Sequence, residues 1–265
     1  NHDYEINLFK EILQFRVCDE LHIGDRILCV HGWPELPHSW RHQVAHFAAR
    51  GYRVAAMDVR GYGGSSRPSE IERYTLAELA GDVAAVAAAL MASDTVQVFH
   101  DHVLVKEPGT SKATPWHQDG PYYFVEGQQN VSLWSPVDPV TEASLRCVAG
   151  SHLWSREVLP TRWLSETAFY PDPEKYMPVP DPDAEGMRVL EWAMEPGDAV
   201  AFNYGTLHGA RGNTTQNRRR AFSLRLLGDD MRYVERPGRT SPPYPGHDMV
   251  AGQKLRVDWF PYLKV

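Results

Sequence analysis

The spacing of hydrophobic and polar residues changes near residue 95. Before that point, apolar residues recur every three or four positions from Leu76 to Leu90, which is typical of an amphipathic helix. Thr75 and Glu78 stand three residues apart where this stretch begins and form a capping-box pattern. We therefore predict a helix that runs to about Met91.

After Thr95 the apolar and polar residues alternate in short runs bounded by Gly and Pro, a pattern that indicates β-strands. Strands are expected at 96–106, 114–124, 129–137, 144–149, 187–194, 198–203, 206–210 and 218–227. This part of the chain is therefore expected to be mainly β, with flanking helices.

The amino-terminal third has another pattern. Apolar residues within 1–20 lie near helical spacing and predict a short packing helix. Short apolar runs at 27–30 and 53–59 predict buried strands, with a helical run to Arg50 between them. The contrast divides the chain into two expected domains, an α/β segment at 1–92 and a β-rich domain at 93–265.

The segment 151–186 interrupts the series of strands. It is rich in proline, which prevents a regular helix or strand through its second half, and it carries several aromatic residues. Long insertions of this kind are often lids or binding loops, although a plain surface excursion is the alternative.

Composition narrows the class of protein. The chain is 43% hydrophobic, yet no apolar run approaches the roughly 18 residues that span a bilayer, so no membrane partner is expected. The net charge of −7 argues against a nucleic-acid partner, because only Arg218–Arg220 form a basic cluster. Cys18, Cys29 and Cys147 show neither a disulfide framework nor metal-type spacing, which suits a cytoplasmic protein.

His117 and Asp119 are the strongest candidates for a metal site. Residues two apart on an extended strand project to the same side, so an imidazole and a carboxylate would face one point. His208 follows the apolar run 199–202 and is the candidate third ligand. Two imidazoles and one carboxylate on one face of a metal are typical of non-haem Fe(II) oxygenases. The alternative is a strand edge whose polar residues face solvent.

An arginine cluster follows the distal histidine. Arg219 lies eleven residues beyond His208, where a permanent cation suits the far carboxylate of a dicarboxylic co-substrate. Alternation points Arg218 and Arg220 away from Arg219, and a register slip of one residue would exchange their places. Arg225 shares the face of Arg219 and is the reserve candidate, with a structural ion pair as its other interpretation.

An ordered set of motifs resembles the phytanoyl-CoA dioxygenase group of Fe(II)/2-oxoglutarate oxygenases over residues 93–265. The resemblance lies in Phe99–His102, Val105–Thr110, Thr114–Asp119, Ser132–Trp134, Gly150–His152, Glu195–Asp198, His208–Gly209 and Arg219–Ala221. It implies a double-stranded β-helix (jelly-roll) core, with Fe(II) and 2-oxoglutarate as cofactors.

The same resemblance assigns roles to residues. His117, Asp119 and His208 are the expected catalytic metal ligands, Arg219 the residue that binds the co-substrate, and Trp134 an aromatic lining its pocket, with core packing as the alternative for Trp134. The implied reaction uses dioxygen to hydroxylate an unactivated C–H bond of a small organic or acyl substrate and releases succinate and CO₂. Related halogenases carry a small residue in place of the carboxylate, so Asp119 favours hydroxylation.

Other residues near these motifs have two interpretations each. His100 and His102 share a strand face, and we expect them to be structural or supporting groups rather than ligands. The aromatic residues beside the metal motif would form either the substrate wall or core; they are Trp116, Tyr122, Tyr123 and Phe124.

Residues 25–88 resemble the opening of an α/β-hydrolase of the epoxide-hydrolase type, carried by His31–Pro34 and Asp58–Pro68. That family needs a nucleophile on a sharp strand-to-helix turn. The only stretch with a similar sequence is Gly246–Met249, which lies in a proline-rich region with no predicted strand before it. Two alternatives to an oxygenase thus stay open, an inactive or non-enzymatic fusion and a hydrolase of epoxides or esters.

Overall fold

The computed structural model describes residues 76–264 except 166, together with 14–17, 26–30, 49, 53–57, 69 and 70; it describes side chains from residue 80 onward and at 49, 69 and 70. Residues 14–17 form a strand rather than part of the expected packing helix, and the rest of that helix lies outside the described residues. The helical run expected before Arg50 also lies outside them. The two strands expected nearby are confirmed.

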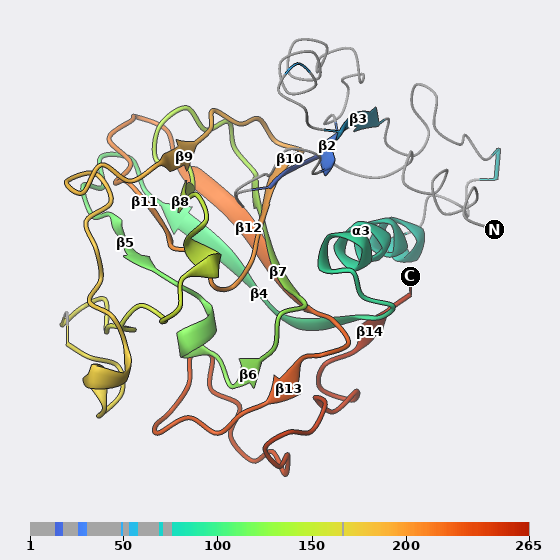
Figure 1. The fold of residues 1–265 in the computed structure, drawn as a ribbon. Helices are drawn as coiled ribbons and strands as arrows, with labels where there is room; N and C mark the ends of the chain where they lie inside the picture. Colours follow the sequence, from blue (N-terminus) through green and yellow to red (C-terminus); the bar gives the residue numbers. More distant parts are fainter. Residues whose placement is uncertain are drawn as a thin grey trace.

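Two sheets form a double-stranded β-helix, as expected (Figure 1). The six-stranded sheet has the order β1 (Gln14–Val17), β10 (Asp198–Phe202), β7 (Asn130–Pro136), β12 (Arg219–Leu227), β4 (Val96–Lys106) and β14 (Tyr262–Leu263). The four-stranded sheet has the order β5 (Thr114–His117), β11 (His208–Ala210), β8 (Arg146–Val148) and β9 (Val189–Glu191). Two further pairs are β13 (Arg232–Tyr233) with β6 (Val125–Glu126), and β2 (Arg26–Val30) with β3 (Arg53–Met57), the latter parallel.

The helix α3 (Leu76–Met91) covers the outer face of the six-stranded sheet, as expected from its apolar spacing (Figure 1). Its small residues Ala84 and Ala87 are fully buried and allow the helix to approach the sheet closely. They share one core with Leu133, Ala201 and Leu226 of the sheet. None of the described helices is long and apolar enough to cross a membrane.

All eight strand ranges expected after residue 95 contain strand, but the range 114–124 is wrong beyond His117. Asp119 has helical backbone angles (φ −71°, ψ −43°), and Gly120–Tyr122 form a 3₁₀ turn. Pro121 favours this turn because its φ is fixed and it has no N–H to donate to a ladder. Strands β6, β13 and β14 are two residues long, too short to show alternation.

A buried asparagine organises the connection into β12. The Nδ2 group of Asn213 donates to the carbonyl oxygens of Lys106 (3.1 Å), Glu107 (3.3 Å) and Asn217 (2.7 Å). These bonds join the turn before β12 to the end of β4. They stabilise the register in which Arg219 stands opposite Lys106.

Candidate metal centre

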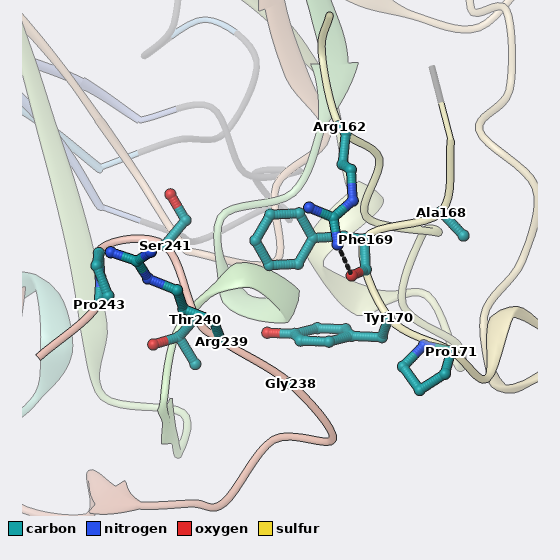
Figure 2. A pocket seen from close by; sticks show the side chains of 10 residues that line it. All are labelled: Arg162, Ala168, Phe169, Tyr170, Pro171, Gly238, Arg239, Thr240, Ser241 and Pro243. Atoms are coloured by element: carbon teal, nitrogen blue, oxygen red, sulfur yellow. Dashed lines mark hydrogen bonds between the residues drawn. The ribbon is translucent and has the colours of Figure 1, made fainter. Parts of the chain in front are cut away.

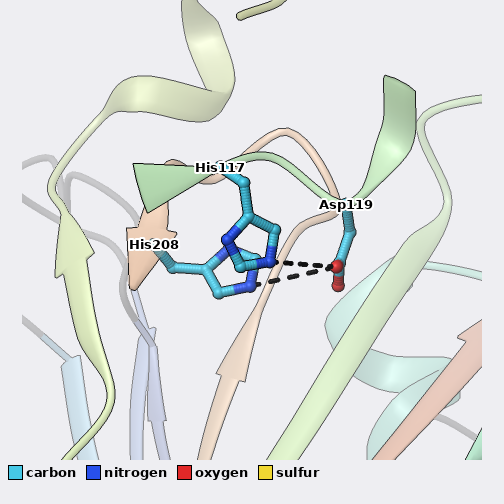
Figure 3. A group of neighbouring side chains, drawn as sticks. All are labelled: His117, Asp119 and His208. Atoms are coloured by element: carbon cyan, nitrogen blue, oxygen red, sulfur yellow. Dashed lines mark ion pairs between the residues drawn. The ribbon is translucent and has the colours of Figure 1, made fainter. Parts of the chain in front are cut away.

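Two neighbouring strands of the four-stranded sheet bring the histidines together. His117 at the end of β5 stands directly opposite His208 at the start of β11. Their Nε2 atoms each lie 3.9 Å from Oδ1 of Asp119, and the side chains converge (Figure 3). All three residues are buried. Two bonds of about 2.1 Å span at most about 4.2 Å, so a metal ion can bridge either imidazole to the carboxylate. The three ligand atoms lie within 4.8 Å of one another, so binding all three to one ion requires at most a small inward movement of the side chains.

The Asp119 carboxylate approaches the two histidines from a backbone conformation that the sequence did not predict. The expectation placed His117 and Asp119 on one extended strand, but the backbone turns at Asp119. The carboxylate therefore approaches from the start of the 3₁₀ turn, and the convergence arises from that turn rather than from strand alternation.

Both histidines are held in the tautomer that a metal requires. The Nδ1 atom of His117 lies 2.8 Å from the carbonyl oxygen of Pro115, and that of His208 lies 2.9 Å from the carbonyl oxygen of Thr206. A carbonyl only accepts, so each Nδ1 carries the proton and each Nε2 keeps its lone pair. Those lone pairs are free to bind a metal on the side of Asp119.

The electrostatics favour the protonation states needed for metal binding. Burial and the neighbouring His208 lower the pKa of His117 to about 3, and burial lowers the pKa of His208. Burial alone would raise the pKa of Asp119, but the neighbouring charges, first among them the Arg225 guanidinium, hold that pKa below its usual range. Near neutral pH the site thus has two neutral imidazoles and one carboxylate.

Only one oxygen of Asp119 faces the histidines. The other oxygen, Oδ2, accepts hydrogen bonds from Ser132 Oγ (3.0 Å) and Arg225 Nε (3.3 Å). Ser132 on β7 and Arg225 on β12 are cross-strand partners, so the six-stranded sheet holds this oxygen from two adjacent positions. Asp119 is thereby arranged to offer a single oxygen, Oδ1, to a metal.

The guanidinium of Arg225 has several hydrogen-bond partners in this arrangement. Its Nε also donates to the Tyr123 hydroxyl (3.1 Å), and its Nη1 donates to Ser223 Oγ. The guanidinium is buried and makes an ion pair with Asp119 at 3.3 Å. These contacts agree with the structural ion pair that was the other interpretation of Arg225, and they leave it little capacity to bind a co-substrate.

Arg219 is buried but has no such partner. Among the described residues none makes a hydrogen bond or ion pair with its guanidinium, which lies 5.6 Å from the ring centre of Trp134. Burial lowers the pKa of Arg219 to about 10. Arg218 and Arg220 are exposed and pair with Glu107 and Asp138. Of the three arginines, only Arg219 faces the interior.

The metal triad and Arg219 line one cavity of about 850 Å³. His117, Asp119 and His208 line it together with Trp134 and Arg219, and the segment 161–165 lines its other side. The Trp163 ring lies 4.8 Å from the His117 ring, edge to face. The segment expected to be a lid or binding loop therefore does cover the metal triad in part.

Gln118 and Tyr122, which flank Asp119, form hydrogen bonds with the segment that covers the metal triad. Gln118 is buried; it accepts a hydrogen bond from Val158 N (2.7 Å) and donates to Gly205 O. The Tyr122 hydroxyl donates to Thr161 O (2.8 Å) and accepts from Thr161 N (2.7 Å). These two roles were not predicted from the sequence, because strand alternation placed the Gln118 side chain on the outward face. The position of Gln118 between two candidate metal ligands was the one feature of the sequence that could have indicated its role.

The remaining candidates divide between cavity and core. His102 lines the cavity, Tyr122 and Tyr123 line it and also pack in one apolar cluster with Phe124, and Phe124 and Trp116 are not part of its lining. Trp134 belongs to both, since it lines the cavity and packs in a core.

Neither His100 nor the Gly246–Met249 stretch provides a further site. His100 is buried among aromatic rings, and no described residue makes a hydrogen bond with either of its ring nitrogens. In the stretch that echoes a hydrolase turn, Asp248 is exposed and pairs with Arg256 at 2.9 Å. No strand is observed among the described residues between Tyr233 and Gly246, so the turn that a hydrolase nucleophile needs is absent there.

Fold and site together define a double-stranded β-helix protein with a buried candidate site for a metal ion. The chain belongs to the phytanoyl-CoA dioxygenase (PhyH) family, whose model matches residues 37–221. The match begins inside the segment that resembles a hydrolase, and the cofactors of the family, Fe(II) and 2-oxoglutarate, suit the residues gathered here.

Two solved structures share the fold at 22% identity. One is the non-heme alpha ketoglutarate dependent carbocyclase SnoK from nogalamycin biosynthesis, with a TM-score of 0.53 over 74% of this chain and 72% of that one. The other is the epimerase SnoN in complex with Fe³⁺, alpha ketoglutarate and nogalamycin RO, with a TM-score of 0.54 over 73% of each chain. At this identity the likeness concerns the fold.

Curated relatives match a short part of the chain. Epoxide hydrolase A from Mycobacterium tuberculosis is 47% identical over 75 residues, which are 28% of this chain and 23% of that protein. An epoxide hydrolase from Caballeronia sordidicola is 41% identical over 78 residues, 29% of this chain and 24% of that protein. The chain thus spans about a quarter of the length of these two relatives, in agreement with a truncated hydrolase-like segment.

The two buried arginines should affect stability in opposite ways. In metal-free protein, Arg225→Met should lower the free energy of unfolding by about 3 kcal/mol, because Asp119 loses its counter-ion. Arg219→Met should leave it unchanged or raise it by up to about 1 kcal/mol, because a buried cation without a partner is removed. Urea unfolding in the presence of a chelator measures both, and a large loss of stability in Arg219→Met would contradict this assignment.

His100 should make the protein acid-sensitive. Burial, Arg225 and His102 lower the pKa of His100 from 6.5 to about 3. Between these values the unfolded chain binds the proton and the folded one does not, so stability falls as pH drops below 6.5, by up to roughly 1.4 kcal/mol per pH unit. His100→Leu should therefore lose less stability than wild type between pH 7.5 and pH 4.5 in urea unfolding. Equal losses would show that His100 does not contribute.

Proposed function

We propose that the protein is an Fe(II)- and 2-oxoglutarate-dependent dioxygenase that hydroxylates an unactivated C–H bond of a small organic or acyl substrate, with release of succinate and CO₂. One observation carries the proposal. The buried triad of His117, Asp119 and His208 lines the same cavity as Arg219, a buried cation with no partner among the described residues.

The donor set fits Fe(II). Two neutral imidazoles and one carboxylate oxygen are the ligands of the facial triad, and they leave positions open for other ligands. His117 and His208 would supply Nε2, with their tautomers held by the Pro115 and Thr206 carbonyls, and Asp119 would supply Oδ1. When bound, iron and 2-oxoglutarate supply the oxidising chemistry, and the protein supplies geometry and a dry cavity.

Arg219 fits the second carboxylate of 2-oxoglutarate. The guanidinium is desolvated, it faces the cavity, and the Trp134 ring lies beside it. A carboxylate there would neutralise a buried charge and can accept two parallel hydrogen bonds. Trp134 would form part of the same pocket and restrict the orientation of the guanidinium.

The remaining walls suit an organic substrate with apolar surface. Trp163, Leu164 and Phe169 line the cavity on the side of the metal triad that the segment 151–186 covers. Apolar side chains there would contact the apolar surface of a bound substrate, and they provide no competing ligand for the metal. Because Asp119 is a carboxylate, no open position for a halide replaces it, and hydroxylation is favoured over halogenation.

The two rival functions make different predictions. In an inactive fusion the triad would fail to bind iron and co-substrate together, or would bind both without turnover. A hydrolase would need a nucleophile with a histidine in reach, and Asp248 is instead exposed and paired with Arg256.

The division into domains at 1–92 and 93–265 is also our proposal, with α3 packed on the sheet of the second domain.

Anaerobic titration with Fe(II) and 2-oxoglutarate tests the proposal. Wild-type protein should develop the weak metal-to-ligand charge-transfer band of a chelated 2-oxo acid, and on admission of oxygen it should form succinate. His208→Ala should lose the band, because it removes one of the two imidazoles that would hold the metal. Arg219→Gln should keep it but need at least roughly tenfold more 2-oxoglutarate, because a charge-assisted pair is lost.

Arg218→Gln is the matched control, since it removes the neighbouring, exposed guanidinium. It should titrate like wild type. A band that survives in His208→Ala, or equal weakening in Arg218→Gln and Arg219→Gln, would refute the site. A band without succinate formation would support the inactive fusion.

A further inference from the structure

A second cavity adjoins the first. It has a volume of about 560 Å³ and lies between the segments 168–171 and 238–243, with Arg162 at its edge (Figure 2). Arg162, Phe169 and Ser241 line both cavities. The two cavities are therefore neighbours, with these three residues between them.

The side cavity carries positive charge without a matching carboxylate. Arg162 and Arg239 line it, and none of the described residues in its wall is acidic. The guanidinium of Arg162 lies 5.3 Å from the ring centre of Phe169 and donates to Phe169 O. Arg239 is exposed and makes no hydrogen bond or ion pair with any described residue. In a chain of net charge −7, this local excess of cations favours an anion.

A buried hydroxyl in the same wall also has no partner. Tyr170 is 3% exposed, and its hydroxyl makes no hydrogen bond with a described residue. Figure 2 shows that hydroxyl pointing toward Thr240 and the base of the Arg239 side chain, whose guanidinium extends toward Pro243. Burial raises the pKa of Tyr170 to about 12, so the group is a neutral donor at physiological pH. A buried donor without an acceptor is costly, which suggests that a ligand supplies the acceptor.

We infer that the side cavity is a subsite for an oxyanion, a carboxylate or phosphate carried by the substrate, bound by Arg162, Arg239 and the Tyr170 hydroxyl. The apolar remainder of the substrate extends past Phe169 into the main cavity, toward the metal triad. This inference rests on the proposed function and adds the substrate class, an organic anion with an apolar body.

The subsite also connects two separate parts of the chain. Arg162 and Tyr170 belong to the segment that covers the metal triad, whereas Arg239 belongs to the stretch after β13. An anion between them would join these segments. It would stabilise the position of Trp163 over His117, so that substrate binding closes the cavity.

Calorimetric titration with octanoate, octyl phosphate and 1-octanol tests the inference. These probes share an apolar chain and differ in the head group, which separates carboxylate from phosphate and both from a neutral hydroxyl. In protein that contains Mn(II) and saturating 2-oxoglutarate, at least one anion should bind at least tenfold more tightly than 1-octanol. Arg239→Gln should weaken the binding of that anion roughly tenfold and leave 1-octanol unchanged.

Two control variants define the effect. Arg239→Lys should keep most of the affinity, because it keeps the charge. Arg188→Gln removes an exposed arginine outside both cavities and should bind like wild type. The inference is overturned if 1-octanol binds as tightly as both anions, or if Arg188→Gln and Arg239→Gln lose the same affinity.

A further variant separates this inference from the proposed function. Arg219→Met removes the other unpaired cation, so anion binding that persists in it cannot arise from the co-substrate site. Anion preference in Arg219→Met, together with no charge-transfer band in wild type, would refute the oxygenase and keep the subsite. A normal band without anion preference would refute the subsite alone.

Discussion

The site depends on how the second oxygen of Asp119 is held. Arg225 and Ser132, cross-strand partners on the six-stranded sheet, both donate to Oδ2, and Oδ1 is left facing His117 and His208. The larger sheet thus orients the carboxylate, and the smaller sheet supplies the imidazoles. This contact links the register of β12 against β7 to the geometry of the candidate metal site, which is why a site formed from both sheets can be rigid before any metal binds.

The strand β12 carries two buried arginines whose surroundings differ. Arg225 has a carboxylate and two hydroxyls around it, whereas Arg219, six residues earlier on the same face, has the Trp134 ring and a cavity. A buried cation without a counter-ion lowers stability, and a protein tolerates such a group where a ligand supplies the missing charge. The contrast explains how one strand can support the candidate metal site and also provide the site that we propose for a dicarboxylate.

Much of this arrangement could be predicted from sequence. The alternation after residue 95, the helix ending at Met91 and the His117–Asp119 pair follow from local spacing, whereas His208 was identified by its place after the apolar run 199–202. The turn at Asp119 was not predicted, because the alternating side chains indicated a continuous strand although Pro121 favours a turn in the backbone. The partners of Arg225 and the anchoring by Gln118 depend on contacts between residues far apart in the chain, for which a single sequence gives no signal.

The most direct test is a crystal structure of the protein with Mn(II) and 2-oxoglutarate, grown without reductant. The account predicts one metal ion bound by the Nε2 atoms of His117 and His208 and by Oδ1 of Asp119 alone, with Arg225 still bonded to Oδ2. A metal bound by both oxygens of Asp119, with Arg225 displaced, would contradict it. So would a triad that remains without metal at saturating Mn(II).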